Sequence, residues 1–201
     1  MIEYFSKDPI IAPKLYYLPV DCSKKPIVSQ YDGEKEYDVL FYGAAFVERR
    51  QKILDSLMKK HNVQIICDKF GAELYKEMQK AKVVINIHYY ANALLETTRI
   101  YETLSVGSSI IVSERSSDPK EEERLSGIVD FVDVDDVDAL CDRVGYWLAC
   151  DQEREEKVKE NNKVLLEHTN ALEYYLARFL LDNEKISQEA FEKMFGKTTD
   201  L

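Results

Sequence analysis

The stretch VVINIHYYANALLETTRIYETLSVGSSIIVSE, residues 83–114, decides the fold of this chain. Two runs of apolar residues, 83–88 and 109–113, are short enough to be buried strands. The segment 93–106 between them has apolar residues at helical spacing, and Gly107 stands where such a helix would end. The stretch therefore predicts strand, helix and strand, joined as a parallel pair.

The same alternation extends to both sides of this stretch. Strands are expected over 38–42, 62–67 and 129–134, in addition to the two above. Helices are expected over about 46–60, 71–79 and 119–126. The first of these would bury one face, made of Phe46, Ile53, Leu54 and Leu57. Strands that alternate with helices indicate an α/β fold, a Rossmann-like parallel sheet of about five to six strands with helices on both faces.

Composition divides the chain into three parts. Residues 1–37 contain four of the five prolines and are expected to be irregular. Residues 38–150 form the Rossmann-like domain, and the acidic run of residues 133–136 is expected to cap its last helix, 136–149, rather than to bind a metal. Residues 151–201 are a helical carboxy-terminal extension, expected to pack back on that domain.

Charge and composition narrow the functional classes. The net charge of −10 argues against nucleic acid as a partner, because that binding needs clustered Lys and Arg. No apolar run is long enough for a transmembrane segment, and no signal peptide is evident. The four cysteines show no metal-binding spacing, so we expect free thiols, a cytoplasmic location and no metal site.

Polar residues gather where the strand 83–88 ends and the next helix begins. In an open α/β sheet, ligands bind at the carboxyl ends of the strands. A helix amino-terminus there offers N–H groups to an anion, and Arg99 lies one turn inside. Glu102 follows one turn later and can accept hydrogen bonds from a diol such as a ribose. Glu96 shares this helix face, and charges so close to apolar strands need partners.

Three further positions have two interpretations each. Gly43 ends the first strand and, with the small Ala44, either shapes a tight turn or lets a ligand approach the backbone. The pair Arg49 and Arg50 is either a solvated face or a source of charge for a phosphate. His88 is either a structural residue or a donor to a sugar hydroxyl or phosphate. From the residues alone, the chain is an α/β domain for a phosphorylated, hydroxyl-rich ligand; the motifs of nicotinamide-binding proteins and P-loop proteins are missing.

The segment TRIYETLSVGSSIIVSE, residues 98–114, resembles the nucleotide-sugar signature of GT-B-fold glycosyltransferases. DVLFYGAAFVERR, residues 38–50, is similar to the first strand and glycine turn of the spore-maturation-like branch of group 1 enzymes. YYLPVD (16–21) and HTNALEYYLARFLLDN (168–183) resemble flanking segments of the carboxy-terminal half of such enzymes.

This resemblance implies a glycosyltransferase, or its donor-binding half, that transfers a sugar from a UDP- or GDP-type donor to a carbohydrate or other hydroxyl acceptor. No metal or cofactor is implied. Glu102 would hold the ribose, and Arg99 would neutralise the diphosphate. The diphosphate would approach Gly43 and Ala44 and accept from the N–H groups of residues 94–96. The donor-binding residues predicted on these grounds are Gly43, Ala44, Arg49, His88, Leu95, Glu96, Arg99 and Glu102.

The chain departs from this family in two respects. The family's first glutamate usually stands eight positions before the second, where this chain has Leu94, and Glu96 stands only six before. A GT-B enzyme also has a second domain, which usually supplies the acceptor site and a catalytic base, and this chain has room for one half. The alternative is therefore a non-catalytic nucleotide-sugar-binding module that needs a partner domain, or a regulatory α/β domain. The sequence does not identify a catalytic residue.

Overall fold

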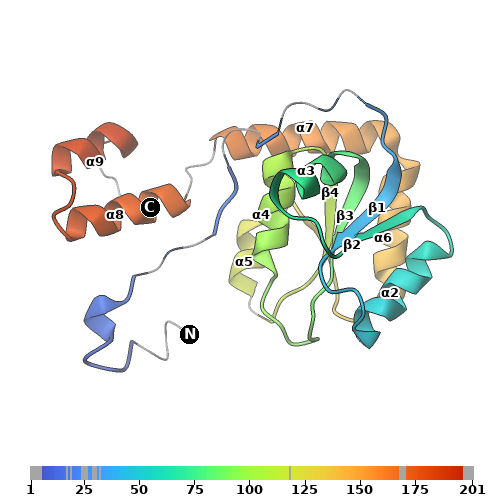
Figure 1. Ribbon diagram of the computed structural model, residues 1–201, viewed down its shortest axis with the longest axis horizontal. Coiled ribbons are helices and arrows are strands. Elements are labelled where there is room, and N and C mark those ends of the chain that lie inside the picture. The colour runs from blue at the N-terminus through green and yellow to red at the C-terminus, as the bar shows by residue number, and fades with distance from the viewer. Residues whose placement is uncertain are drawn as a thin grey trace. The chain divides into compact units, whose positions relative to one another are not determined.

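The computed structural model describes residues 6–16, 18, 20–23, 27–28, 31, 33–117, 119–167 and 171–196. The chain forms two compact units, one of residues 22–168 and the other of residues 1–21 with 169–201. The sequence had placed divisions after residues 37 and 150 instead. The first of these compact units contains the sheet, and its elements are labelled in Figure 1.

The larger unit is built on a five-stranded parallel sheet, as the alternating pattern predicted. The strand order is β2-β1-β3-β4-β5, and every pairing is parallel. The chain adds β2 to one side of β1 and then crosses to add β3 on the other side. The sheet therefore has its topological switch point between β1 and β3, where open α/β sheets bind ligands. The strands are β1 (Tyr37–Tyr42), β2 (Val63–Ile66), β3 (Ala81–Asn86), β4 (Ile110–Glu114) and β5 (Asp130–Val132).

Helices cover both faces of this sheet, so its inner strands are buried on both sides. Figure 1 shows α2 and α6 on one face and α3, α4 and α5 on the other. Neighbouring side chains of β1 point to opposite faces of the sheet. Phe41 packs with α2 and α6, and Leu40 packs with α3. This explains why the strands read as continuous apolar runs. The helices are α2 (Glu48–Met58), α3 (Gly71–Gln79), α4 (Thr97–Val106), α5 (Pro119–Arg124) and α6 (Val137–Ala149).

Most helix ends lie within two residues of the prediction, but α4 begins at Thr97 rather than near residue 93, and the start of α2 was also misplaced. The Asp136 carboxylate accepts from the Ala139 N–H at 2.9 Å, which confirms it as the cap of α6. Helix α2 begins only at Glu48, so Phe46 lies in the preceding loop with 73% of its surface exposed. The prediction that Phe46 joins the apolar face of this helix was wrong, because an exposed aromatic residue happened to fall at helical spacing.

Helix α7 (Asp151–Glu167) completes the larger unit at the amino-terminal edge of the sheet. Asn161 donates to the Ile128 carbonyl at 3.0 Å, and Asn162 donates to the Gly107 carbonyl at 2.8 Å. Those two carbonyls precede β5 and β4, so α7 lies across the ends where these strands begin.

The smaller unit contains a short 3-10 helix, η1 (Ala12–Lys14), and the helices α8 (Ala171–Asp182) and α9 (Gln188–Phe195). An aromatic cluster joins α8 to α9, with the Tyr174 ring centroid 5.7 Å from that of Phe191. Tyr16 packs edge-on against Phe179 of α8 at 4.5 Å. This unit therefore has a small apolar core of its own.

Replacing Gly107 by alanine is expected to lower the free energy of unfolding by about 2–3 kcal/mol. Gly107 ends α4 in the left-handed region at φ 68°, and a Cβ there would lie 2.8 Å from Asn162 Oδ1. The variant combines backbone strain with the loss of one hydrogen bond. Gly145→Ala in α6 is the control. No atom lies near the Cβ that this change adds, so the free energy of unfolding should rise by about 0.5–1 kcal/mol. Urea denaturation measures both, and equal shifts would contradict the role given to Gly107.

Candidate functional site

The candidate site lies at the switch point, around the backbone turn that follows β1. Gly43 has φ 118°, which an L residue with a side chain rarely adopts. A Cβ at Gly43 would lie 3.2 Å from Nη2 of Arg99. The sequence left open a tight turn or the approach of a ligand at Gly43, and in this structure the Arg99 guanidinium lies beside the glycine.

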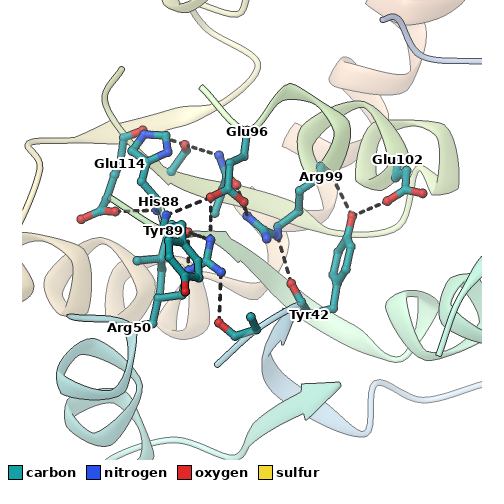
Figure 2. Close-up of polar contacts among 12 residues, drawn as sticks. Tyr42, Arg50, His88, Tyr89, Glu96, Arg99, Glu102 and Glu114 are labelled. Atoms are coloured by element: carbon teal, nitrogen blue, oxygen red, sulfur yellow. Dashed lines mark hydrogen bonds and ion pairs between the residues drawn. The ribbon is translucent and has the colours of Figure 1, made fainter. Parts of the chain in front are cut away.

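Arg99 of α4 is buried against the ends of β1 and β3. Its Nε donates to the Tyr42 carbonyl at 3.2 Å, and its Nη1 donates to Oδ1 of Asn86. Nη1 also lies 2.7 Å from Oε2 of Glu96, and the guanidinium lies over the rings of Phe41 and Tyr42. These contacts fix the cation at the switch point (Figure 2).

Arg50 of α2 brings a second buried cation to the same place, with only 3% of its surface exposed. Its Nε and Nη2 both donate to the Ile87 carbonyl, and its Nη1 donates to the Ala44 carbonyl at 3.0 Å. Nη2 also donates to Oε1 of Glu96 at 2.5 Å. Burial and the nearby Arg99 charge lower the pKa of Arg50, although Glu96 opposes this shift.

Glu96, the residue that precedes α4, is the one carboxylate that these two arginines share. It accepts from Arg50 and Arg99, and also from the Tyr89 N–H at 3.0 Å. Burial would raise the pKa of Glu96, but the two guanidinium charges outweigh burial and hold the pKa below its usual range. Figure 2 shows its carboxylate lying between the two cations.

Arg49 lies one residue before Arg50, and its guanidinium contacts a different set of residues. It forms a two-pronged ion pair with Glu114, the last residue of β4, which is almost fully buried. Its Nη1 also donates to the His88 carbonyl at 2.8 Å, and its Nε lies 2.7 Å from Oδ1 of Asp135. Arg49 therefore ties the ends of β3, β4 and β5 together.

His88 is fully buried just beyond β3. Its backbone N–H donates to Glu114 at 2.9 Å, and its Nε2 lies 3.0 Å from the Arg115 carbonyl. A carbonyl only accepts, so Nε2 carries a hydrogen in this contact. Nδ1 has no hydrogen-bond partner in the described part of the chain. These contacts match the structural interpretation of His88.

The loop before α4 has one of its predicted anion donors already engaged. The Leu95 N–H donates to Oγ of Ser116 at 3.1 Å, and the Leu95 side chain is buried. Ala44 contributes its carbonyl to Arg50, as described above. An anion at this loop would reach the Leu95 N–H only after the Ser116 hydroxyl turned away.

Glu102 lies one turn along α4 from Arg99 and is partly exposed. Its Oε2 accepts from the Tyr42 hydroxyl at 2.8 Å. Burial, followed by the charge and the hydrogen bond of Glu102, raises the pKa of Tyr42, so this phenol remains a donor. The Tyr75 hydroxyl of α3 also hydrogen-bonds to this carboxylate, so a ligand hydroxyl would share Glu102 with two tyrosines.

The structure thus brings together Gly43, Ala44, Glu96 and Arg99, while Arg49 and His88 belong to the adjacent Glu114 cluster. Sequence reasoning missed Asn86 and gave Arg49 precedence over Arg50. A signal for Arg50 was present: it shares the spacing i, i+3, i+4, i+7 with the buried face of α2 at Ile53, Leu54 and Leu57.

The cluster of Arg50, Glu96 and Arg99 at the switch point is called the arginine crevice below. Two guanidiniums and one carboxylate leave a net positive charge beside the Glu102 carboxylate. Among the described residues, no group of His, Cys, Asp or Glu could hold a metal ion, and no helix is long and apolar enough to cross a bilayer. No protein-family model matches the chain, and no curated protein matches its sequence.

Proposed function

We propose that this chain binds a nucleoside-diphosphate sugar and serves as the donor-binding half of a glycosyltransferase of the GT-B type, acting in the cytoplasm without a metal. The observation that supports this most is the pair of buried arginines, Arg50 and Arg99, sharing the single carboxylate of Glu96 at the switch point. Glu102 follows on the same helix, at the position that suits a sugar hydroxyl.

In this proposal the donor diphosphate takes the place of the Glu96 carboxylate. Arg50, Arg99 and the Tyr89 N–H all donate to Glu96, so they already form a cradle for oxygen anions. Guanidinium groups suit phosphate because they donate in a planar fork. The same charges would stabilise the nucleoside diphosphate as it leaves the sugar, which is the electrostatic form of catalysis.

Glu102 would hold the ribose of the donor. The hydroxyls of Tyr42 and Tyr75 fix the direction of this carboxylate, and its remaining lone pairs would accept from the ribose. Hydrogen bonds to an ionised carboxylate are stronger than those between neutral groups. The order of phosphate site and ribose site along α4 then follows the order of the donor itself.

Replacing Glu102 by alanine is expected to weaken nucleoside-diphosphate binding by about 1.5–3 kcal/mol, roughly 10- to 150-fold, because a charge-assisted hydrogen bond is lost. Calorimetric titration with UDP, GDP, ADP and TDP measures this and identifies the base that is preferred. Glu123→Ala, an exposed glutamate on α5, is the control and should bind as the parent chain does. Equal affinities of parent and Glu102→Ala for every diphosphate would contradict the ribose site.

The second candidate function is a nucleotide-sugar-binding module without catalysis, and one observation favours it. The carboxylates in the crevice are engaged: Glu96 by two arginines, Glu114 by Arg49, and Glu102 by Tyr42. None is placed as a free general base. Sugar transfer, or slow donor hydrolysis that Glu102→Ala abolishes, would support the enzyme. Donor binding with neither reaction would support the module, with the acceptor site supplied by another domain or subunit.

A further inference from the structure

A cavity of about 640 Å³ lies at the opposite edge of the sheet from the arginine crevice. Its walls come from the segment before β1, the carboxyl ends of α3 and α4, and one side of α7. Its volume falls in the range of small-molecule sites. The crevice residues Arg50, Glu96 and Arg99 do not line it, so it is a separate feature.

Lys35 places an ammonium group at the cavity, and its hydrogen-bond partners are backbone carbonyls. Its ammonium donates to the Gln79 carbonyl at 2.7 Å and to the Ser108 carbonyl at 2.6 Å. An ammonium has three donors, so one remains for another partner. No described carboxylate lies within ion-pair distance of Lys35. The cation is held by two neutral carbonyls at the edge of an open space.

The remaining walls combine positive charge with apolar surface. Two more cations, Arg154 and Lys159, line the cavity from α7, against one carboxylate, Glu155. Arg154 already pairs with Asp151 at 2.6 Å. The apolar part of the lining consists of Val28, Leu104, Val106 and Val158. An inorganic anion would satisfy the charge and leave these apolar walls without contacts.

We propose that this cavity is a binding site for a small organic anion, with its acidic group on Lys35 and an apolar body against Val28, Val106 and Val158. The inference does not depend on the nucleotide-sugar proposal, because the two sites share no residue. Burial, helped by the nearby Arg154 charge, lowers the pKa of Lys35 to about 8. An anion against the ammonium would oppose this shift, so binding and proton uptake at Lys35 are coupled.

The test uses 8-anilinonaphthalene-1-sulfonate, an aromatic sulfonate whose fluorescence rises in apolar surroundings. The full chain is titrated at pH 7 and at pH 9.5. We expect roughly 10-fold or more loss of affinity at the higher pH, where Lys35 loses its proton, and a similar loss at pH 7 in Lys35→Met. Arg154, Glu155, Lys159 and Tyr31 also face the cavity, and Lys35→Met keeps all four, so it isolates the Lys35 contribution.

Lys52→Met, an exposed lysine of α2, is the matched control and should bind as the parent does. Circular dichroism checks folding, and if Lys35→Met unfolds, Lys159→Met takes its place, with an expected loss of several-fold. Octanoate and hexyl phosphate then compete with the dye. Displacement by either supports the site and shows whether it takes a carboxylate or a phosphate.

Three results would overturn this proposal. The first is dye affinity that is equal in Lys35→Met and the parent, or in Lys159→Met and the parent if that variant is used. The second is displacement of the dye by nucleoside diphosphates, which would place it in the arginine crevice. The third is a dye that neither octanoate nor hexyl phosphate displaces.

Discussion

Replacing Arg50 by methionine is expected to lower the free energy of unfolding by about 3–5 kcal/mol, because it breaks a buried ion pair from one side. Arg50 is 3% exposed and donates to the backbone of Ala44 and Ile87 as well as to Glu96. Methionine has a similar length but no donor, so two carbonyls lose this donor and Glu96 keeps only Arg99 and the Tyr89 N–H. Urea denaturation of the two proteins measures the difference.

Arg143→Met is the control for this variant. Arg143 pairs with Asp130 on the surface of the same unit, and 43% of its side chain is exposed. An exposed ion pair contributes about 0–1 kcal/mol to the free energy of unfolding. A loss at Arg50 no larger than the loss at Arg143 would mean that water reaches Glu96 and the two carbonyls once the guanidinium is gone.

Replacing Glu96 by glutamine is expected to tighten the binding of inorganic pyrophosphate by roughly 10- to 100-fold. The Glu96 carboxylate pairs with both Arg50 and Arg99 in this structure, so an anion must displace it. A hydrogen bond to a charged group contributes about 1.5–3 kcal/mol of free energy, which the anion must overcome. Glutamine keeps the size and can still accept from the Tyr89 N–H. It competes less well because it carries no charge.

Calorimetry with pyrophosphate, without a nucleoside, measures this effect at the phosphate site alone. Glu123→Gln controls for the change in net charge and should leave the affinity nearly unchanged. Weaker binding in Glu96→Gln would mean that the carboxylate helps to hold the ligand. Unchanged binding would mean that pyrophosphate settles away from the two arginines.

The fold could be predicted because its signals are local. Each strand is a short apolar run, and Asp136 and Gly107 mark helix ends by their own backbone chemistry. These features depend on a few neighbouring residues, so a sequence displays them directly. The limits of α2 were less certain, because Phe46 is apolar and yet exposed.

The partners within the site could not be predicted in the same way. Arg50 and Glu96 are 46 positions apart, and their contact depends on how α2 and α4 dock on the sheet. Two adjacent arginines look alike in the sequence, but the rotation of about 100° between neighbouring helix positions directs Arg50 to Glu96 and Arg49 to Glu114. Lys35 gave no signal at all, since its partners are backbone carbonyls that any residue could supply.

The position of α7 has a consequence for the order in which the chain folds during synthesis. The ribosome releases all five strands before it releases Asn161 and Asn162, whose side chains satisfy the Ile128 and Gly107 carbonyls. Domains generally fold from the amino-terminal side as they emerge. The nascent sheet can therefore assemble first, but its amino-terminal edge stays open to solvent and to chaperones until α7 has left the exit tunnel.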